Sequence, residues 1–409
     1  MRALIITTGS RGDVQPFVAL SRALTQSGHE AVIAAPRRFG ALVSRHGTEF
    51  LPMDEGVLAL QDDLTHRGLL TALTSARAVA PLLRAWLDDV ARLVGTECDV
   101  VVYAPKALGA TDLADRIGVP SIAALTVPLY TPTGEFGTPL VPARLPAALR
   151  RPSWRLVSAV EGAHRGLVGR WRSGRLGLSG PPAKLAERIA SEGALHLWSR
   201  HLLSAPADWP SGAAPLGALG LPRESGWTPP ESLTRFLSEG EAPVYVGFGS
   251  TVARDPDGLT RAVVEGVRLS GRRAILASGW GALSSRPQSS KEVLVVDEVP
   301  HDHVFAHVAV AVHHGGAGTV AAALRAGVPQ VVRPFVGDQW FWGQRVRAIG
   351  VGPAPLTGRL SPESVAAAIT RATEHTDRAE RLAELVKEEE ANAPGDAVRR
   401  VLAAASRAS

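Results

Sequence analysis

Short apolar runs that stop at glycine or proline alternate with amphipathic stretches along most of the chain. The run RALIITTG, at residues 2–9, is unbroken and rich in β-branched residues, as in a strand that is covered on both faces. The stretch at residues 16–28 spaces its apolar positions for one helical face and ends at glycine, which predicts a helix. The run EAVIAAP then predicts a second strand. Strands that alternate with helices indicate a parallel α/β sheet.

The same alternation recurs in both halves of the chain. Further strands are predicted at DVVVYAP, SIAALT, APVYVGFGS, RAILASG, EVLVVDEV, VAVAVHHGG and PQVVRP. A stretch rich in Pro, Gly, Ala and Ser, SAPADWPSGAAPLGALGLPRESGWTPP, separates the two sets. We therefore predict two doubly wound domains, residues 1–205 and 231–385, a linker, residues 206–230, and a charged helical tail, residues 386–409.

Composition narrows the class of protein. A length of 409 residues suits two domains, and the net charge of +5 does not call for nucleic acid. The single cysteine, Cys98, excludes an internal disulfide. The first apolar run is shorter than a signal peptide requires, and no run of about 20 apolar residues follows. We therefore expect a cytoplasmic protein without a membrane span.

One segment departs from the α/β pattern. Residues 144–175 hold eight arginines, a single carboxylate, Glu161, and two interleaved tryptophans. Such a segment is either a solvated helical surface or a surface that meets an acidic acceptor, a partner or an anionic membrane.

A glycine turn in the second half is the strongest chemical signal. Gly315–Thr319 follows an apolar strand and precedes a helix, so the free N–H groups of the helix start can attract phosphate oxygens. This predicts a phosphate on Ala317, Gly318 and Thr319; the alternative is an ordinary tight turn. A second glycine turn, Gly247–Ser250, ends another strand of the same half.

Polar residues flank this turn. Asp338 and Gln339 offer a carboxylate and an amide that suit sugar hydroxyls, or alternatively cap a helix. His313 is placed to donate to a phosphate oxygen, or is a buried, satisfied histidine. Because His313 and His314 are adjacent on an extended strand, they point to opposite sides, which disfavours a shared metal ion.

The first strand runs into the turn ITTGSRGDVQPF, which contains Arg11, Gly12 and Asp13. Asp13 has four interpretations: part of an adhesion-type tripeptide, the rim of a phosphate-binding turn, a helix cap, or a catalytic carboxylate.

Two segments carry a family resemblance. HHGGAGTVAAALRAGVPQVVRPFVGDQWFWGQRV strongly resembles the donor-binding signature of GT-B nucleotide-sugar glycosyltransferases, the GT1-like family that includes antibiotic, macrolide and sterol glycosyltransferases. GSRGDVQP resembles the amino-terminal signature of the same family. The two segments lie at opposite ends of the chain in the family's order, and GDQWFWG is most similar to the branch with sterol, lipid-like and bacterial natural-product acceptors.

The resemblance implies two Rossmann-like domains that face a cleft. The second domain would bind the nucleotide sugar, the first would bind the acceptor, and the helix at 386–409 would pack back towards the first domain. By motif position, Ser250, His313 and Gly316–Thr319 would hold the diphosphate, and Ser10 and Arg11 would close over it from the other domain. The base would meet Trp280 and the backbone of Val299, and the sugar would meet Asp338 and Gln339.

The family reaction is inverting and metal-independent, and it requires a base for the acceptor hydroxyl. Plant members place a histidine in the first turn, whereas bacterial members with GSRGD place the aspartate there, here Asp13. A free aspartate with a pKa near 4 is a weak base, so partial burial or concerted transfer is needed. The rival interpretation is that Asp13 caps the helix or only orients the acceptor.

The expected substrates are UDP-glucose or a TDP-sugar and a small, largely apolar hydroxyl compound with a polyketide, sterol-like or aromatic scaffold. Residues 58–83 and 125–155 would line the acceptor pocket, and the protein would be a monomer or homodimer. Two other functions are considered, a nucleotide-sugar epimerase of GT-B architecture and a non-catalytic helper of a partner transferase. The paired signatures disfavour the first, and the retained donor residues disfavour the second.

Overall fold

In the computed structural model, the chain folds into two compact units. The first unit comprises Met1–Leu221 and Glu389–Ser409, and the second comprises Pro222–Glu388. The structure describes residues 1–56, 76–223, 226–249, 251, 253, 255–279, 283, 289–297 and 299–408.

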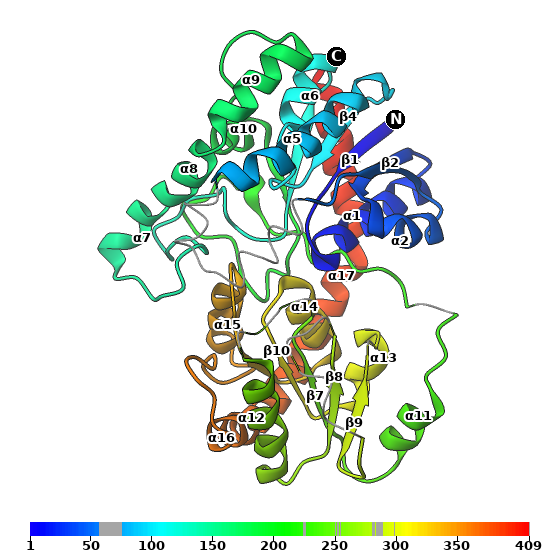
Figure 1. The fold of residues 1–409 in the computed structure, drawn as a ribbon, viewed down its shortest axis with the longest axis vertical. Coiled ribbons are helices and arrows are strands. Elements are labelled where there is room, and N and C mark those ends of the chain that lie inside the picture. Colours follow the sequence, from blue (N-terminus) through cyan, green and yellow to red (C-terminus); the bar gives the residue numbers. More distant parts are fainter. Residues whose placement is uncertain are drawn as a thin grey trace. The chain divides into compact units, whose positions relative to one another are not determined.

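The described part of the first unit contains a six-stranded parallel sheet in the order β3-β2-β1-β4-β5-β6 (Figure 1). Its strands are β1 Arg2–Ile6, β2 Glu30–Pro36, β3 Glu49–Met53, β4 Val100–Tyr103, β5 Ser121–Leu125 and β6 Ala194–His196. Its helices are α1 Arg11–Gln26, α2 Gly40–Arg45, α5 Ala76–Arg92, α6 Ala110–Ile117, α7 Ala147–Ser153, α8 Arg155–Gly162, α9 Arg165–Leu176 and α10 Leu185–Glu192.

The second unit repeats this plan with a five-stranded parallel sheet in the order β11-β10-β7-β8-β9 among its described residues (Figure 1). The strands are β7 Val244–Gly247, β8 Ala274–Ala277, β9 Val293–Val296, β10 Val310–His313 and β11 Gln330–Val332. The helices are α11 Glu231–Ser238, α12 Pro256–Leu269, α13 His301–Val304, α14 Ala317–Ala326, α15 Gln339–Ala348 and α16 Pro362–Thr373. Both sheets are doubly wound, which confirms the predicted fold class.

Burial explains the apolar runs. Leu4, Ile5 and Ile6 of β1 are fully buried, because helices cover both faces of a parallel sheet. The long helix α17, Thr376–Ala405, starts in the second unit and ends in the first. Its residues Ala397 and Val401 belong to the core cluster that also contains β1. This apolar stripe is the physical reason why the tail belongs to the first unit.

The predicted linker is only partly a linker. Trp209, Leu216 and Leu219 are buried, and the latter two belong to the core cluster of the first unit, which extends to Leu221. Abundant proline and glycine indicated a flexible connection, but the apolar residues among them pack.

Candidate active site

The strand order reverses once in each sheet. In the first unit this happens between β1 and β4, and in the second between β7 and β10. Ligands of doubly wound sheets bind beyond the carboxyl ends of the strands at such switch points. Where these four strands end, the chain places Asp13, Lys106, Gly247–Gly249 and Gly315–Thr319 in the turns or at the starts of the helices that follow.

The turn after β10 is built for glycine. Gly315 has a φ of +92°, and a Cβ there would lie 2.7 Å from Cγ1 of Val332 and 2.8 Å from the carbonyl oxygen of Gln339. Helix α14 begins directly afterwards, with Gly316 as its N-cap. The Val320 N–H donates to the Gly316 carbonyl at 3.0 Å, so the N–H groups before Val320 are those that a helix start leaves to a ligand.

His313 is fully buried and has both ring nitrogens in hydrogen bonds. Nδ1 accepts from the Gly315 N–H at 3.1 Å, so Nε2 carries the proton and donates to Oε1 of Gln330 at 3.0 Å. Burial lowers the pKa of His313 to about 3, so the ring is neutral at pH 7. The predicted hydrogen bond from His313 to a phosphate has no N–H left to make it, and the structure favours the alternative of a satisfied, buried histidine that fixes the turn.

His314 occupies the position that the prediction gave to its neighbour. A Cβ on Gly249 would lie 3.1 Å from Cε1 of His314, and a Cβ on Gly316 would lie 3.3 Å from its Cε1 and collide with its Nε2. The imidazole therefore lies next to both glycine turns. Its Nδ1 is buried without a hydrogen-bond partner among the described residues, and burial lowers its pKa to about 4. A neutral imidazole has one ring N–H group, which can donate a hydrogen bond to an anionic ligand such as a phosphate.

Asp338 and Gln339 stabilise the loop before α15. Oε1 of Gln339 accepts from the N–H groups of Phe335 and Val336, at 2.7 and 3.1 Å. Oδ2 of Asp338 accepts from Nε1 of Trp342 at 2.9 Å, and Asp338 is the N-cap residue of α15 without a capping hydrogen bond from its side chain. The contact of both residues with sugar hydroxyls stays a prediction, and for Gln339 the donor would be Nε2.

Three further residues were predicted to contact the donor, and the structure describes one of them. Val299 is buried in the core cluster of the second unit that contains Tyr245 and Ile275, so its side chain packs while the predicted base contact concerns its backbone. Ser250 and Trp280 lie outside the described residues.

Asp13 folds back onto its own turn at the start of α1. Its Oδ2 accepts from the N–H and Oγ of Ser10, at 2.8 and 2.9 Å, and its Oδ1 pairs with Nζ of Lys106. Gly9 has a φ of +122°, and a Cβ there would lie 2.6 Å from Cγ of Asp13, so only glycine leaves room for the carboxylate. The helix-cap interpretation is therefore correct in geometry, because Asp13 accepts the N–H of the N-cap residue Ser10.

The contacts with Ser10 use only one of the two carboxylate oxygens of Asp13. The Asp13 side chain keeps 17% of its surface exposed, and its Oδ1 lies on the side away from Ser10. Arg11 and Gly12 lie in the first turn of α1, so the three residues do not form the extended loop of an adhesion motif. The predicted contacts of Ser10 and Arg11 with a diphosphate stay predictions.

The loop after β5 falls within the predicted acceptor segments, of which residues 58–75 lie outside the described ones. Asp208 accepts from Oγ1 of Thr133 at 2.6 Å and from the Gly134 N–H at 2.9 Å. At the end of β6, His196 packs against Trp209 and its Nε2 lies 3.1 Å from Oγ1 of Thr131. The loop is thus held by a buried contact between Thr131 and His196, by aromatic packing and by the partly exposed contacts of Asp208.

Protonation of His196 should destabilise the protein. Burial, with a smaller contribution from Arg400, lowers its pKa to about 4, whereas an unfolded histidine titrates near 6.5. The unfolded state therefore binds more protons between these values, and stability falls as the pH falls from about 6.5 to about 4, by on the order of 3 kcal/mol at most. Thermal unfolding midpoints at pH 7 and 4.5 measure the loss. His196→Gln keeps a donor to Thr131 but does not titrate, so its loss should be smaller; an equal loss would refute this role.

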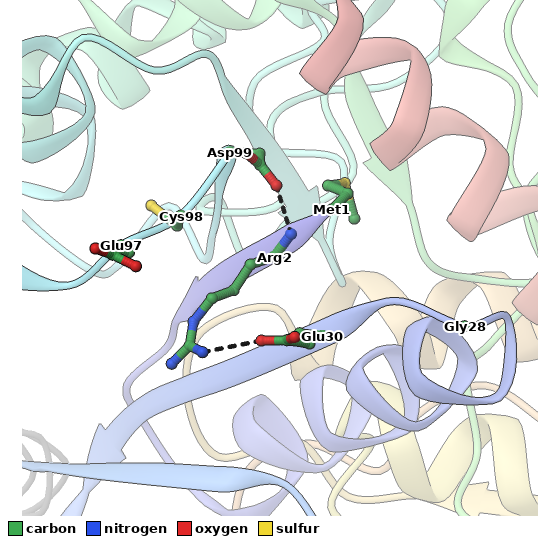
Figure 2. Close-up of a pocket in the computed structure, with 7 residues that line it drawn as sticks. All are labelled: Met1, Arg2, Gly28, Glu30, Glu97, Cys98 and Asp99. Carbon is green, nitrogen blue, oxygen red and sulfur yellow. Dashed lines mark hydrogen bonds and ion pairs between the residues drawn. The ribbon is translucent and has the colours of Figure 1, made fainter.

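A hollow of about 680 Å³ lies at the amino-terminal ends of β1 and β4, opposite the carboxyl ends that form the switch point (Figure 2). The Arg2 N–H donates to Asp99 at 2.6 Å and its guanidinium donates to Glu30 at 2.9 Å. Burial raises the pKa of Cys98 to about 11, so this thiol is no nucleophile at neutral pH. The hollow is lined by Met1, Arg2, Gly28, Glu30, Glu97, Cys98 and Asp99, away from the switch point.

Comparison with known proteins finds one family model in each half of the chain. Residues 3–131 match the family model of the glycosyltransferase family 28 N-terminal domain. Residues 281–403 match that of the erythromycin biosynthesis protein CIII-like C-terminal domain. The sterol 3-beta-glucosyltransferase UGT80A2 of Arabidopsis thaliana is 34% identical over 375 residues, which cover 87% of this chain and 58% of the relative. The chain spans only about a quarter of the matched fungal sterol 3-beta-glucosyltransferases.

Solved structures share the fold over the whole chain. The calicheamicin glycosyltransferase CalG4 has a TM-score of 0.70 at 21% identity, and the alignment covers 99% of this chain and 98% of CalG4. The Streptomyces sp. SF2575 glycosyltransferase SsfS6, complexed with thymidine diphosphate, has a TM-score of 0.61 at 23% identity and covers 98% of both chains.

Proposed function

We propose that the chain is a GT-B glycosyltransferase, the family that its two signatures resemble, and that it transfers a sugar from a nucleoside diphosphate sugar to a hydroxyl group of a sterol-like or polyketide-like acceptor. The observation that carries the proposal is the β10–α14 turn, where a glycine-lined helix start and His314 converge at a switch point. The sterol and antibiotic relatives supply the acceptor class, and their names support an acceptor that is largely apolar.

The β10–α14 turn would stabilise the leaving diphosphate. Negative charge grows on the diphosphate as the glycosidic bond breaks, and N–H groups fixed at a helix start meet that charge without reorganising. His314 would add a ring N–H next to the two glycine turns. UDP-glucose and TDP-glucose both fit this role; relatives named glucosyltransferases favour glucose, and thymidine diphosphate in SsfS6 favours the TDP donor.

Asp13 would take the proton of the acceptor hydroxyl. The hydroxyl would attack the anomeric carbon from the face opposite the leaving diphosphate, which inverts the configuration. Oδ1 of Asp13, the carboxylate oxygen not bonded to Ser10, would receive the proton as the new bond forms.

A matrix of donors and acceptors tests this function. UDP-glucose and TDP-glucose are each incubated with the protein and a sterol, a macrolactone or no acceptor, and the released nucleoside diphosphate is measured. The proposal expects release that depends on the acceptor. An epimerase would convert the sugar without an acceptor, and a non-catalytic helper would do neither.

Chelation should leave the proposed reaction unchanged. The described residues contain no group of three His, Cys, Asp or Glu side chains arranged to hold a metal ion, and the β10–α14 turn offers N–H donors for the diphosphate instead. Turnover in excess EDTA should therefore equal turnover with added Mg²⁺ within about twofold. A loss of tenfold or more with EDTA, restored by Mg²⁺, would contradict metal-independent transfer.

Within the arginine-rich segment, residues 144–175, the structure leaves one surface as a candidate for membrane contact, the surface of α7 and α8. Arg172 and Arg175 pair with aspartates, Arg151 pairs with Asp208, and Arg165 donates to a backbone carbonyl. On α7 and α8, in contrast, Leu149, Leu156 and Val160 are exposed by 53, 42 and 53%. No described helix is long and apolar enough to cross a bilayer.

We propose that α7 and α8 bind peripherally to an anionic membrane. The exposed Arg155 lies in sequence between the exposed apolar residues of these helices and would meet the lipid headgroups. Wild-type protein should cosediment with vesicles that contain phosphatidylglycerol, and binding should fall severalfold in the Leu156→Ser/Val160→Ser variant. Leu269→Ser, which removes an apolar side chain of similar exposure from the second unit, is the control. Equal binding of all three proteins would rule out this surface.

A further inference from the structure

We infer that Lys106 is the positioning residue of Asp13. The strands β1 and β4 are parallel neighbours, and Ile6 pairs with Tyr103 at their carboxyl ends. Asp13 follows the first strand and Lys106 follows the second, so the switch point brings together two residues that are 93 positions apart. The inference rests on the proposed function, because it assigns a role within the same site.

The two carboxylate oxygens of Asp13 have different partners. Oδ2 is held by the N–H and Oγ of Ser10, at 2.8 and 2.9 Å, within the turn. Oδ1 is held by the ammonium group of Lys106, which comes from the neighbouring loop. Because the carboxylate is planar, the Ser10 and Lys106 contacts act on the same terminal torsion, and Lys106 is the partner that holds it from outside the turn.

Orientation is what a carboxylate base lacks by itself. The terminal torsion of an aspartate is broad, and a displacement of about 1 Å at a reacting group can cost about a hundredfold in rate. A charge-assisted hydrogen bond from a fixed neighbour narrows this torsion. The Lys106 side chain is 49% exposed, so water can solvate its ammonium group when the proton reaches Asp13 and the ion pair ends.

Steady-state kinetics of Lys106 variants test the role with the donor and acceptor that the wild type uses. Lys106→Met should lower kcat by about 10–100-fold and leave the KM for the donor unchanged. Lys106→Arg should restore most of the rate, because a guanidinium can hold the same oxygen. Lys106→Ala should regain part of its activity in added ethylamine. Lys184→Met, which removes an exposed lysine paired with Glu187, should behave like the wild type.

A second readout does not require activity. The rate at which acetic anhydride modifies each lysine is measured by mass spectrometry in wild type and Asp13→Asn. Pairing should protect Lys106 in the wild type, and Asp13→Asn should speed its modification severalfold while Lys184 is unaffected.

The outcomes separate the two proposals. An active wild type with an unimpaired Lys106→Met overturns the inference and leaves the proposed function intact. Equal modification of Lys106 in wild type and Asp13→Asn also overturns it. A wild type that transfers no sugar overturns the proposed function, and the positioning role of Lys106 falls with it.

Discussion

Asp13→Asn should lower kcat by about 10²–10⁴-fold and leave donor binding unchanged. The asparagine side-chain oxygen can still accept from Ser10, so the cap at the start of α1 survives, but an amide cannot take a proton from the acceptor. Because Asp13 is in the first unit and the β10–α14 turn is in the second, the substitution leaves the predicted diphosphate site as it is.

Donor affinity by calorimetry and turnover by product formation separate these effects. Asp88→Asn is the control, since Asp88 pairs with Arg175 on the surface of the same unit. Turnover within a few-fold of the wild type would remove Asp13 from the role of base and leave it as a cap.

His314→Ala should weaken donor binding and lower kcat by about 10²–10³-fold, the usual effect of removing one hydrogen-bond donor from a developing negative charge. The His314 ring lies next to the glycine turns that end β7 and β10, close to both Gly249 and Gly316. Truncation leaves a gap at the surface of the turn, and the fold itself should persist.

The neighbouring histidine provides the contrast. His313→Gln removes a fully buried ring that bridges Gly315 and Gln330, so it should lower the unfolding midpoint of the protein. Donor affinity measured below that midpoint should change much less than in His314→Ala. If His313→Gln abolished donor binding in a folded protein while His314→Ala did not, the assignment of the two rings would be reversed.

The apolar runs predicted every strand of the second sheet and the inner strands of the first, because strands of a covered parallel sheet read as continuous apolar runs. The strands β3 and β6 were not predicted, and both lie at the edges of the first sheet. The segment of β3, EFLPM, contains a proline, and β6, ALH, has no β-branched residue, whereas the equally short β11 has two valines. In the strand β3 only Met53 is buried, so its segment lacks a continuous apolar run.

The glycine turns of the candidate site were predicted from the sequence, whereas the roles of their side chains stay predictions. Glycines that precede a helix lie at both switch points, and the requirement for glycine is local. The choice between His313 and His314 depends on which face of β10 is buried. The signal for it is Gln330, a fully buried amide in the neighbouring strand that needs a polar partner. Lys106 could not be found without the strand order that brings it to Asp13.

The stereochemistry of the product tests the central claim most directly. The protein is incubated with a sterol or macrolactone acceptor and with UDP-glucose or TDP-glucose whose glucose carries an isotope label. The product is then analysed by NMR. The account predicts a β-linked glucoside and an equimolar amount of nucleoside diphosphate. An α-linked glucoside would contradict the inverting mechanism, and donor consumption that is independent of any acceptor would contradict the transfer itself.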